Sequence, residues 1–142
     1  MSTPFTIIER LPTVEEYVRL IAAVGFRPRR REAIEMALRH SWFSVCAESE
    51  AEAIGMGRLI GDGGLHLYLT DVVVHPACQR RGVGTAIVVA LTAWVDAVPF
   101  PNTVVGLIPT PGLVGFHQRH GYKPQRSDSP AMMKWINPQQ EV

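Results

Sequence analysis

The sequence contains few of the residues that form metal centres and disulfide frameworks. Its 142 residues include two cysteines, Cys46 and Cys78, which are too few for a disulfide framework and stand in no metal-like cluster. The five histidines do not form a spacing that is typical of zinc sites. The sequence therefore predicts neither a metal centre nor a fold held by disulfides.

An excess of charge of one sign is also missing. The chain has 14 lysines and arginines against 13 aspartates and glutamates, which leaves a formal net charge of +1. This balance argues against sequence-independent binding of nucleic acid, which relies on neutralising many phosphates. The densest basic stretch, Arg27 to Arg31, is interpreted as the solvated start of a helix.

Long apolar runs are absent as well. The longest, around Ile87 to Val95, is too short and too interrupted to cross a bilayer. The first residues, Met1 to Pro4, lack the charged start and the apolar stretch of a signal peptide. We therefore expect a soluble, cytoplasmic protein that has no membrane partner.

The overall composition is that of a globular domain. Hydrophobic residues make up 46% of the chain and charged residues 19%, which is enough to bury a core. No repeat, low-complexity tract or linker interrupts it. Residues 1–142 are therefore expected to form a single domain.

Strand and helix patterns alternate along the chain. Strands are predicted at residues 5–9, 43–48, 54–60, 65–74, 103–108, 122–126 and 131–136. Helices are predicted between Thr13, a candidate N-cap, and Gly25, and at residues 31–40, 84–98 and 113–120. This order indicates a mixed α/β (α+β) fold with a mostly antiparallel sheet of about seven strands, flanked by four helices. The helical crossover makes residues 65–74 and 103–108 parallel neighbours.

A basic, glycine-rich loop joins the long predicted strand at residues 65–74 to the helix that follows. Its residues are Gln79-Arg80-Arg81-Gly82-Val83-Gly84, and they come after a His75-Pro76 break. Such a loop gathers unpaired backbone N–H groups at a helix start, where the helix dipole favours an anion. The two arginines add charge and forked donors. The sequence therefore predicts a pyrophosphate site at this loop.

Other phosphate motifs fit this loop less well. A Walker loop needs a Lys-Ser or Lys-Thr pair after its last glycine, and a dinucleotide fingerprint needs a third glycine after Gly82 and Gly84. The Gly55-Met56-Gly57 sequence lies inside a predicted strand with no helix after it. A nucleotide-binding module stays open as an alternative, and so does an ordinary tight turn without a ligand.

Together, these features resemble the GCN5-related N-acetyltransferases, the GNAT superfamily. The family signature is Gln or Arg, two residues, Gly, one residue, and Gly or Ala, which corresponds to Gln79–Gly84 here. A second segment, Gly115–Tyr122, is similar to the family's late Phe-Tyr-x-x-x-Gly-Phe segment. The order of elements resembles the family from Phe5 to Ile136. The resemblance thus implies a GNAT-type fold for nearly the whole chain.

The resemblance also implies that acetyl-CoA is the co-substrate. In the family, the loop amides hold the CoA pyrophosphate, and the preceding strand splays from its parallel neighbour and pairs with the pantetheine arm. Carried over, the pantetheine strand is Val72–Val74, and the N–H of Val74 is the candidate oxyanion donor. The implied cofactor-binding residues are Val72, Val73, Val74, Gln79, Arg80, Arg81, Gly82, Val83, Gly84, Thr85 and Phe116.

Two positions depart from the family pattern. The tyrosine that follows the family's phenylalanine often protonates the leaving thiolate, and the residue after Phe116 here is His117. Pro111 stands where many members carry an asparagine that supports CoA. His117 can be a general acid, a neutral N–H donor to the sulfur, or a packed side chain.

Asp71 stands just before the implied pantetheine segment. Strand alternation predicts that its side chain shares a face with Val73, away from Thr70, Val72 and Val74. It is a candidate to accept the proton of an attacking amine, directly or through water, or to bind the ammonium. The alternative is a buried aspartate that holds loop backbone.

We therefore expect an N-acetyltransferase in which a primary amine attacks acetyl-CoA directly in a ternary complex. Within the family, the strand ending Asp71–Val74 and the segment Ala131–Trp135 resemble plastid-type arylamine acetyltransferases. This favours a small or aromatic amine as the acceptor. A CoA-binding sensor with little or no catalysis is the alternative, and a homodimer is left open.

Overall fold

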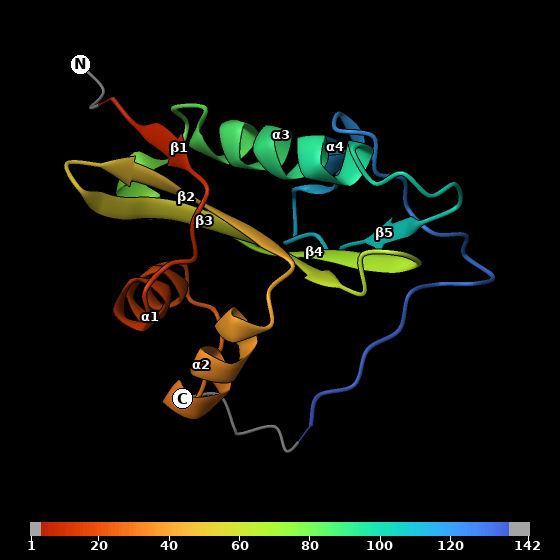
Figure 1. The fold of residues 1–142 in the computed structure, drawn as a ribbon, viewed down its shortest axis with the longest axis horizontal. Coiled ribbons are helices and arrows are strands. Elements are labelled where there is room, and N and C mark those ends of the chain that lie inside the picture. The colour runs from red at the N-terminus through yellow and green to blue at the C-terminus, as the bar shows by residue number, and fades with distance from the viewer. Residues whose placement is uncertain (1–3, 137–142) are drawn as a thin grey trace. The chain divides into compact units, whose positions relative to one another are not determined.

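The computed structural model describes residues 4–136 (Figure 1). The chain forms two compact units, one that ends at Ile108 and one that begins at Pro109. Within the described residues, the first unit holds the sheet and the three longer helices, and the second holds one short helix. The expectation of a single domain stays a prediction.

A five-stranded sheet organises the first unit, with its strands in chain order. They are β1 (Thr6–Ile8), β2 (Phe43–Ser49), β3 (Glu52–Gly61), β4 (His66–Val74) and β5 (Val104–Gly106). Strands β1 to β4 pair antiparallel, whereas β4 and β5 pair in parallel. The predicted parallel neighbours are confirmed, because α3 (Val83–Asp96) carries the chain from β4 to β5.

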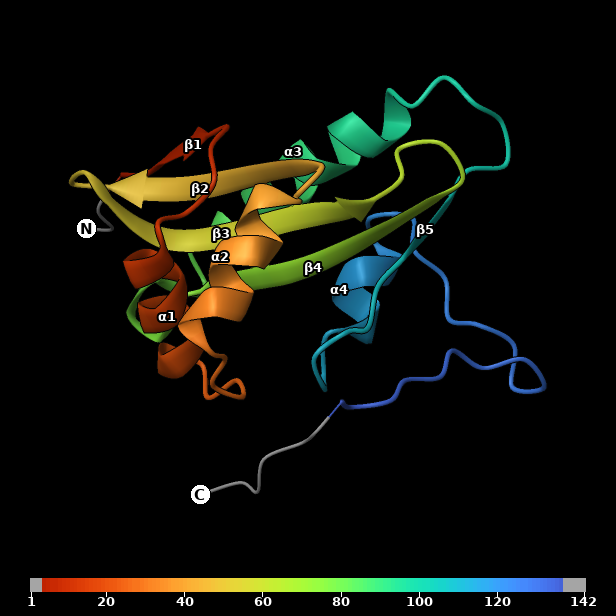
Figure 2. The ribbon, with the colours of Figure 1, turned by 60° about the horizontal axis from the view of Figure 1, so that its bottom comes forward.

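Helices cover both faces of this sheet. α1 (Val14–Ala23) and α2 (Arg31–Arg39) lie on one side, and α3 lies on the other (Figures 1 and 2). α1 begins with a capping box: Thr13 Oγ1 accepts from the Glu16 N–H at 3.1 Å, and Glu16 Oε1 accepts from the Thr13 N–H at 2.9 Å. This confirms Thr13 as the N-cap. None of the described helices is both long enough and apolar enough to span a membrane.

The face of the sheet under α1 and α2 carries a continuous apolar core. Burial raises the pKa of the Cys46 thiol to about 11, so it stays protonated and packs as a small apolar group. The core consists of Tyr17, Leu20, Ile21, Ile34, Leu38, Cys46, Ala53, Met56 and Val73.

Glycines in β3 let α3 approach the opposite face closely. A Cβ on Gly57 would stand 2.6 Å from Ile87 Cγ2 and 2.8 Å from Leu91 Cδ1, and both of these side chains are fully buried. A Cβ on Gly55 would meet Ile87 Cδ1 at 3.0 Å. In this fold the two glycines therefore serve the packing between sheet and helix.

The second unit contains α4 (Val114–Gln118) and, within residues 109–136, no strand. The strands expected at residues 122–126 and 131–136 are therefore wrong, and the sheet has five strands where about seven were predicted. Pro124 cannot donate to a ladder, and no described strand pairs with residues 131–136. The mixed, mostly antiparallel fold class itself is confirmed.

Gly57→Ala tests the close contact between β3 and α3. The added methyl would press on two buried side chains, so we expect the free energy of unfolding to fall by about 1–3 kcal/mol, the usual cost of overpacking. Urea denaturation measures this change. Gly64→Ala is the matched control, because a Cβ there meets only Asp62 Oδ1 at 3.8 Å. Equal stability of the two variants would contradict the packing argument.

Candidate functional site

The chain leaves β4 through a tight, hydrogen-bonded turn. The His75 N–H donates to Ile54 O at 2.8 Å, and His75 Nδ1 accepts from the Ala77 N–H at 3.1 Å. A short 3₁₀ turn, Pro76–Cys78, follows. The predicted break after Val74 therefore stops the strand and turns the chain toward α3.

Two left-handed residues shape the loop between this turn and α3. Arg80 has a φ of 64°, and Gly82, the N-cap of α3, has a φ of 81°. Glycine enters this region without steric cost, which explains its presence at position 82. The start of α3 lies close to the strand end, because a Cβ on Gly84 would stand 3.7 Å from Val74 Cγ2. The loop is thereby held against the end of β4.

Backbone N–H groups gather at this loop. The first hydrogen bond of α3 runs from the Ala86 N–H to Gly82 O at 3.0 Å. The N–H groups of residues 80–85 donate to no acceptor in the described part of the chain. α3 has 14 residues, so its dipole adds positive potential at the same place. With Arg80 and Arg81 exposed beside it, the loop can bind a phosphate or a diphosphate.

β4 has an open edge beyond its short pairing with β5. His66, Leu67 and Tyr68 pair with Val104–Gly106, and the pairing ends there. Along residues 69–74, no described strand pairs with β4 on this side. Backbone groups that face this edge are available to an extended ligand.

One extra residue in β4 changes which peptide groups face the open edge. Arg58 pairs with Thr70 and Met56 pairs with Val73, so β4 has one more residue than β3 between these two pairs. Asp71 lies in this bulge in a left-handed conformation, with a φ of 55°. An extra residue of this kind interrupts the regular alternation of the strand.

The directions of the hydrogen bonds reveal the effect of the bulge. Leu65 O accepts from the Val104 N–H at 2.9 Å, so the peptide group of Leu65 faces β5. In a regular strand every second residue faces the same way, and His75 would then face that side as well. Its N–H instead bonds to Ile54 in β3 at 2.8 Å. The alternation is therefore reversed beyond Asp71.

As a result, Val72 and Val74 turn their peptide groups toward the open edge. Val74 O accepts from Gln79 Nε2 at 3.1 Å, and the Val74 N–H has no acceptor among the described residues. The edge at this position therefore offers an unpaired donor, beside a carbonyl that already accepts one hydrogen bond. Val73 differs, because its peptide group faces β3 and its side chain is buried in the core.

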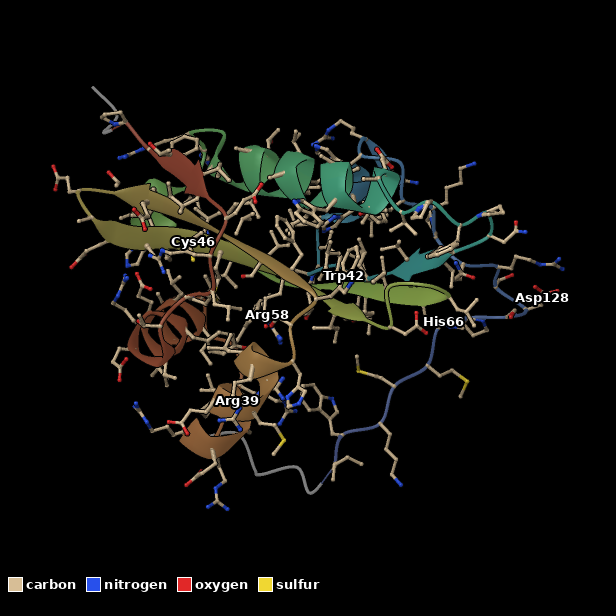
Figure 3. All side chains as sticks on the ribbon, in the orientation of Figure 1. Arg39, Trp42, Cys46, Arg58, His66 and Asp128 are labelled. Atoms are coloured by element: carbon tan, nitrogen blue, oxygen red, sulfur yellow. The ribbon has the colours of Figure 1, made fainter. Side chains whose placement is uncertain are left out.

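Asp71 belongs to a buried polar cluster next to the bulge. Its Oδ2 accepts from Tyr17 Oη at 3.0 Å and from Arg58 Nε at 2.9 Å. Arg58 Nη1 donates to Ala37 O at 3.1 Å and to Ser41 Oγ at 3.0 Å. The side chains of Arg58 and Asp71 are only 8% and 14% exposed. Figure 3 shows Arg58 between the sheet and α2.

Asp71 is a largely buried aspartate, as one of the two interpretations proposed, but within residues 4–136 it accepts from the side chains of Tyr17 and Arg58 and not from loop backbone. Burial, together with the neighbouring carboxylate, raises the pKa of Tyr17, so its hydroxyl stays protonated and donates. Asp71 faces the same side as Val73, as alternation predicted. Thr70 was predicted on the opposite face but shares this side, because it pairs with Arg58 and the bulge begins after it. Its second oxygen, Oδ1, accepts from no described residue, so it keeps lone pairs for a proton or an ammonium.

His117 lies in α4 of the second unit. It is buried, and its Nδ1 has no hydrogen-bond partner among the described residues. Its ring centroid lies 5.1 Å from that of Phe116 and 6.2 Å from that of Tyr122. Burial, with a smaller contribution from His120, lowers the pKa of His117. A neutral imidazole at pH 7 favours the N–H donor and the packed side chain over the charged acid.

The predicted site residues fall in both units. Asp71, residues 72–74 and the loop at residues 79–85 lie together where β4 meets the start of α3. Phe116, His117 and Pro111 belong to the second unit. Their roles toward a cofactor at the loop stay predictions.

Tyr17 and Arg58 were not predicted as site residues from the sequence. Arg58 stands within the apolar run at residues 54–60, and a buried arginine needs an acidic partner. Asp71, in the next strand, was the available signal for that pairing. Tyr17 carried no such signal, because it recurs with the apolar residues of its helix.

Comparison with known proteins finds a family whose model matches this sequence. The sequence matches the model of the acetyltransferase (GNAT) family over residues 11–122. It is 35% identical over 107 residues to serotonin N-acetyltransferase 2, chloroplastic, of Oryza sativa subsp. japonica, which covers 72% of this chain and 52% of that protein. It is 31% identical over 105 residues to GCN5-related N-acetyltransferase 1, chloroplastic, of Arabidopsis thaliana, with the same shares covered. The chain spans about half the length of these curated relatives.

Solved structures share the fold. A protein of unknown function from meticillin-resistant Staphylococcus aureus, described as a probable acetyltransferase, has a TM-score of 0.88 at 28% identity, covering 94% of this chain and 100% of that one. A GNAT family acetyltransferase from Streptococcus pneumoniae TIGR4 has a TM-score of 0.78 at 27% identity, covering 96% and 100%.

The lowered pKa of His117 predicts a pH-dependent stability. The unfolded chain takes up this proton near the ordinary value of 6.5, whereas the folded protein resists it, so stability falls as the pH drops through that range. We expect His117→Gln to lose less unfolding free energy than the wild type between about pH 8 and pH 5. Urea denaturation of both proteins at the two pH values measures the difference. An identical pH dependence would contradict the assignment.

Proposed function

The chain belongs to the acetyltransferase (GNAT) family, and we propose that it transfers an acetyl group from acetyl-CoA to the primary amine of a small molecule. The observation that carries the proposal is the combination of loop donors at residues 80–85 with the donor at the Val74 edge. Both belong to one continuous segment of chain.

The loop suits the diphosphate of coenzyme A. A diphosphate needs several donors and positive potential, which the free N–H groups, the start of α3 and the two exposed arginines supply. The residues proposed to hold it are those of the segment Gln79–Thr85. Bound there, acetyl-CoA supplies the thioester whose acetyl group is transferred.

The open edge of β4 suits the pantetheine arm. The amide groups of pantetheine need backbone partners, and Val72 and Val74 turn peptide groups toward that edge. Because the Val74 N–H faces the open edge and has no acceptor among the described residues, it is available to donate to the thioester oxygen. A donor fixed in advance at this oxygen stabilises the negative charge that develops during attack.

The proposed reaction is direct attack of a free amine on the bound thioester. The amine must lose a proton, and Asp71 is the proposed acceptor through Oδ1, directly or through water. His117 is the proposed hydrogen-bond donor to the sulfur of the departing thiolate. Its lowered pKa keeps the imidazole neutral, and a neutral N–H stabilises the thiolate by a hydrogen bond without giving up its proton.

A small aromatic amine is the proposed acceptor. One relative is named a serotonin N-acetyltransferase, and the strand ending Asp71–Val74 resembles plastid-type arylamine acetyltransferases. The near-neutral charge of the chain gives no reason to favour a strongly charged protein as acceptor. The cytoplasmic location and the homodimer stay predictions.

A CoA-binding sensor without turnover is the second candidate. The observation that favours it is His117, which stands where the family carries the tyrosine that protonates the thiolate. Such a protein would bind acetyl-CoA through the same loop and strand edge but release no thiol.

A thiol-release screen decides between these candidates. Acetyl-CoA is offered with arylalkylamines, amino acids, polyamines and peptides, and we expect release of free thiol with a small aromatic amine. Tight binding of acetyl-CoA without release across the panel would favour the sensor. Thermal protection by ATP or NAD and none by CoA would overturn both in favour of a nucleotide-binding module.

Gly82→Ala tests the loop as the diphosphate site. Alanine disfavours the left-handed φ of 81°, so a smaller fraction of molecules presents the loop amides correctly. We expect the Kd for CoA to rise about fivefold to tenfold by calorimetry. Gly25→Ala is the matched control, because Gly25 also has a positive φ, 75°, in open space, but lies outside the loop. Equal CoA affinity in the two variants would exclude this site.

His117→Ala tests the proposed donor to the thiolate. We expect kcat to fall about tenfold to a hundredfold while the KM for acetyl-CoA changes little, because a donor to the leaving group acts in the transition state. Steady-state kinetics with the acceptor found in the screen measures both constants. Gln118→Ala, at an exposed neighbour in α4, is the control. An unchanged kcat in His117→Ala would remove its catalytic role.

A further inference from the structure

The bulge in β4 is an unfavourable backbone feature that the surrounding structure must hold in place. Asp71 has a φ of 55°, in the left-handed region that residues with a Cβ enter at a steric cost, although aspartate tolerates it better than most. A bulge also leaves its extra residue outside the ladder, so neighbouring strands contribute little to fixing it. Hydrogen bonds to the Asp71 side chain are therefore the main interactions that can stabilise the bulge.

Two donors from different elements meet at one oxygen of Asp71. Tyr17 in α1 donates to Oδ2 at 3.0 Å, and Arg58 in β3 donates to the same atom at 2.9 Å. Both donors lie in the core, since Tyr17 is 8% exposed and Arg58 is 7% exposed. The bonds are thus largely shielded from competing water.

Arg58 extends the same connection to α2. Its Nη1 donates to Ala37 O at 3.1 Å and to Ser41 Oγ at 3.0 Å, while Ser41 Oγ donates to Ala37 O at 3.2 Å. The planar guanidinium spans these partners and Asp71 at once, which a lysine ammonium would not do. The bulge is therefore tied to both helices that cover this face of the sheet.

We propose that Tyr17 and Arg58 are positioning residues that act through the Asp71 carboxylate to hold the bulge and thereby aim the N–H of Val74 at the acetyl group. The inference rests on the proposed function, because it concerns the same strand edge. It adds two residues from outside the loop and the edge, one from α1 and one from β3. It also predicts that the strand edge and the loop, the two parts of the cofactor site, respond differently to loss of the cluster.

The separation follows from where the bulge acts. It decides whether Val72 and Val74 face the open edge, along which the pantetheine arm and the thioester are proposed to lie. The loop amides at residues 80–85 take their positions from their own backbone conformation and from α3. Loss of the cluster should weaken binding along the strand edge and leave diphosphate binding at the loop intact.

Tyr17→Phe is the decisive variant, because it removes one hydroxyl and keeps the ring in the core. We expect the Kd for CoA to rise roughly tenfold, the size of one hydrogen bond to a charged group. We expect no change in the Kd for the 3′-phosphorylated ADP fragment, which carries the diphosphate but no pantetheine. Calorimetry measures both, and kcat/KM for acetyl-CoA should fall by a similar factor.

Arg58→Lys and a control variant test the alternative of general destabilisation. Arg58→Lys should show the same split and, combined with Tyr17→Phe, less than the product of the two effects, because both residues act on one oxygen. Ser44→Ala is the matched control, since it removes a buried hydroxyl that donates to Gly57 O at 3.2 Å outside the cluster. It should lower the melting temperature and leave both affinities unchanged.

The amide NMR signals of residues 72 and 74 supply a readout in the free protein. They should shift in Tyr17→Phe and stay in place in Ser44→Ala. If Tyr17→Phe loses only melting temperature, with unchanged amide shifts and an unchanged ratio of the two affinities, the inference is overturned and the proposed function stands. If the wild type binds neither CoA nor its fragment, both are overturned.

Discussion

The extra residue at Asp71 is the constraint around which the first unit is arranged. It reverses the alternation of β4, so that Val72 and Val74 turn their peptide groups to the edge that β5 leaves open. Its carboxylate receives bonds from Tyr17 and Arg58, which connect the strand to the helices on that face. A shift of one residue in strand register thus makes the direction of the free N–H donors depend on side chains that are packed in the core.

The other donors come from the opposite face of the sheet. Glycines in β3 let α3 pack closely, and the start of this helix lies against the end of β4. The loop at residues 80–85 is thereby presented beside the open strand edge, with its N–H groups unpaired among the described residues. Donors that are fixed before a ligand arrives cost little reorganisation when they bind or stabilise charge.

Much of this arrangement could be predicted from local patterns. The capping signal at Thr13, the glycine-rich loop and the helix after Gly82 are each specified by a few neighbouring residues. The parallel pairing of β4 with β5 followed from the helical crossover. The two C-terminal strands were predicted wrongly, because short apolar runs carry no information about whether a partner strand is present.

Spacing along the chain was sufficient to predict the loop and its helix, since helix starts and tight turns are local events. Asp71 became a candidate through its place before the pantetheine segment that the family resemblance implied. Only the tertiary structure establishes that Asp71 lies in a bulge and bonds to Tyr17 and Arg58. These two residues are separated from it by 54 and 13 positions along the chain. The reason is that a bulge is a relation between two strands, and a buried charge is satisfied by whichever donor the fold brings near.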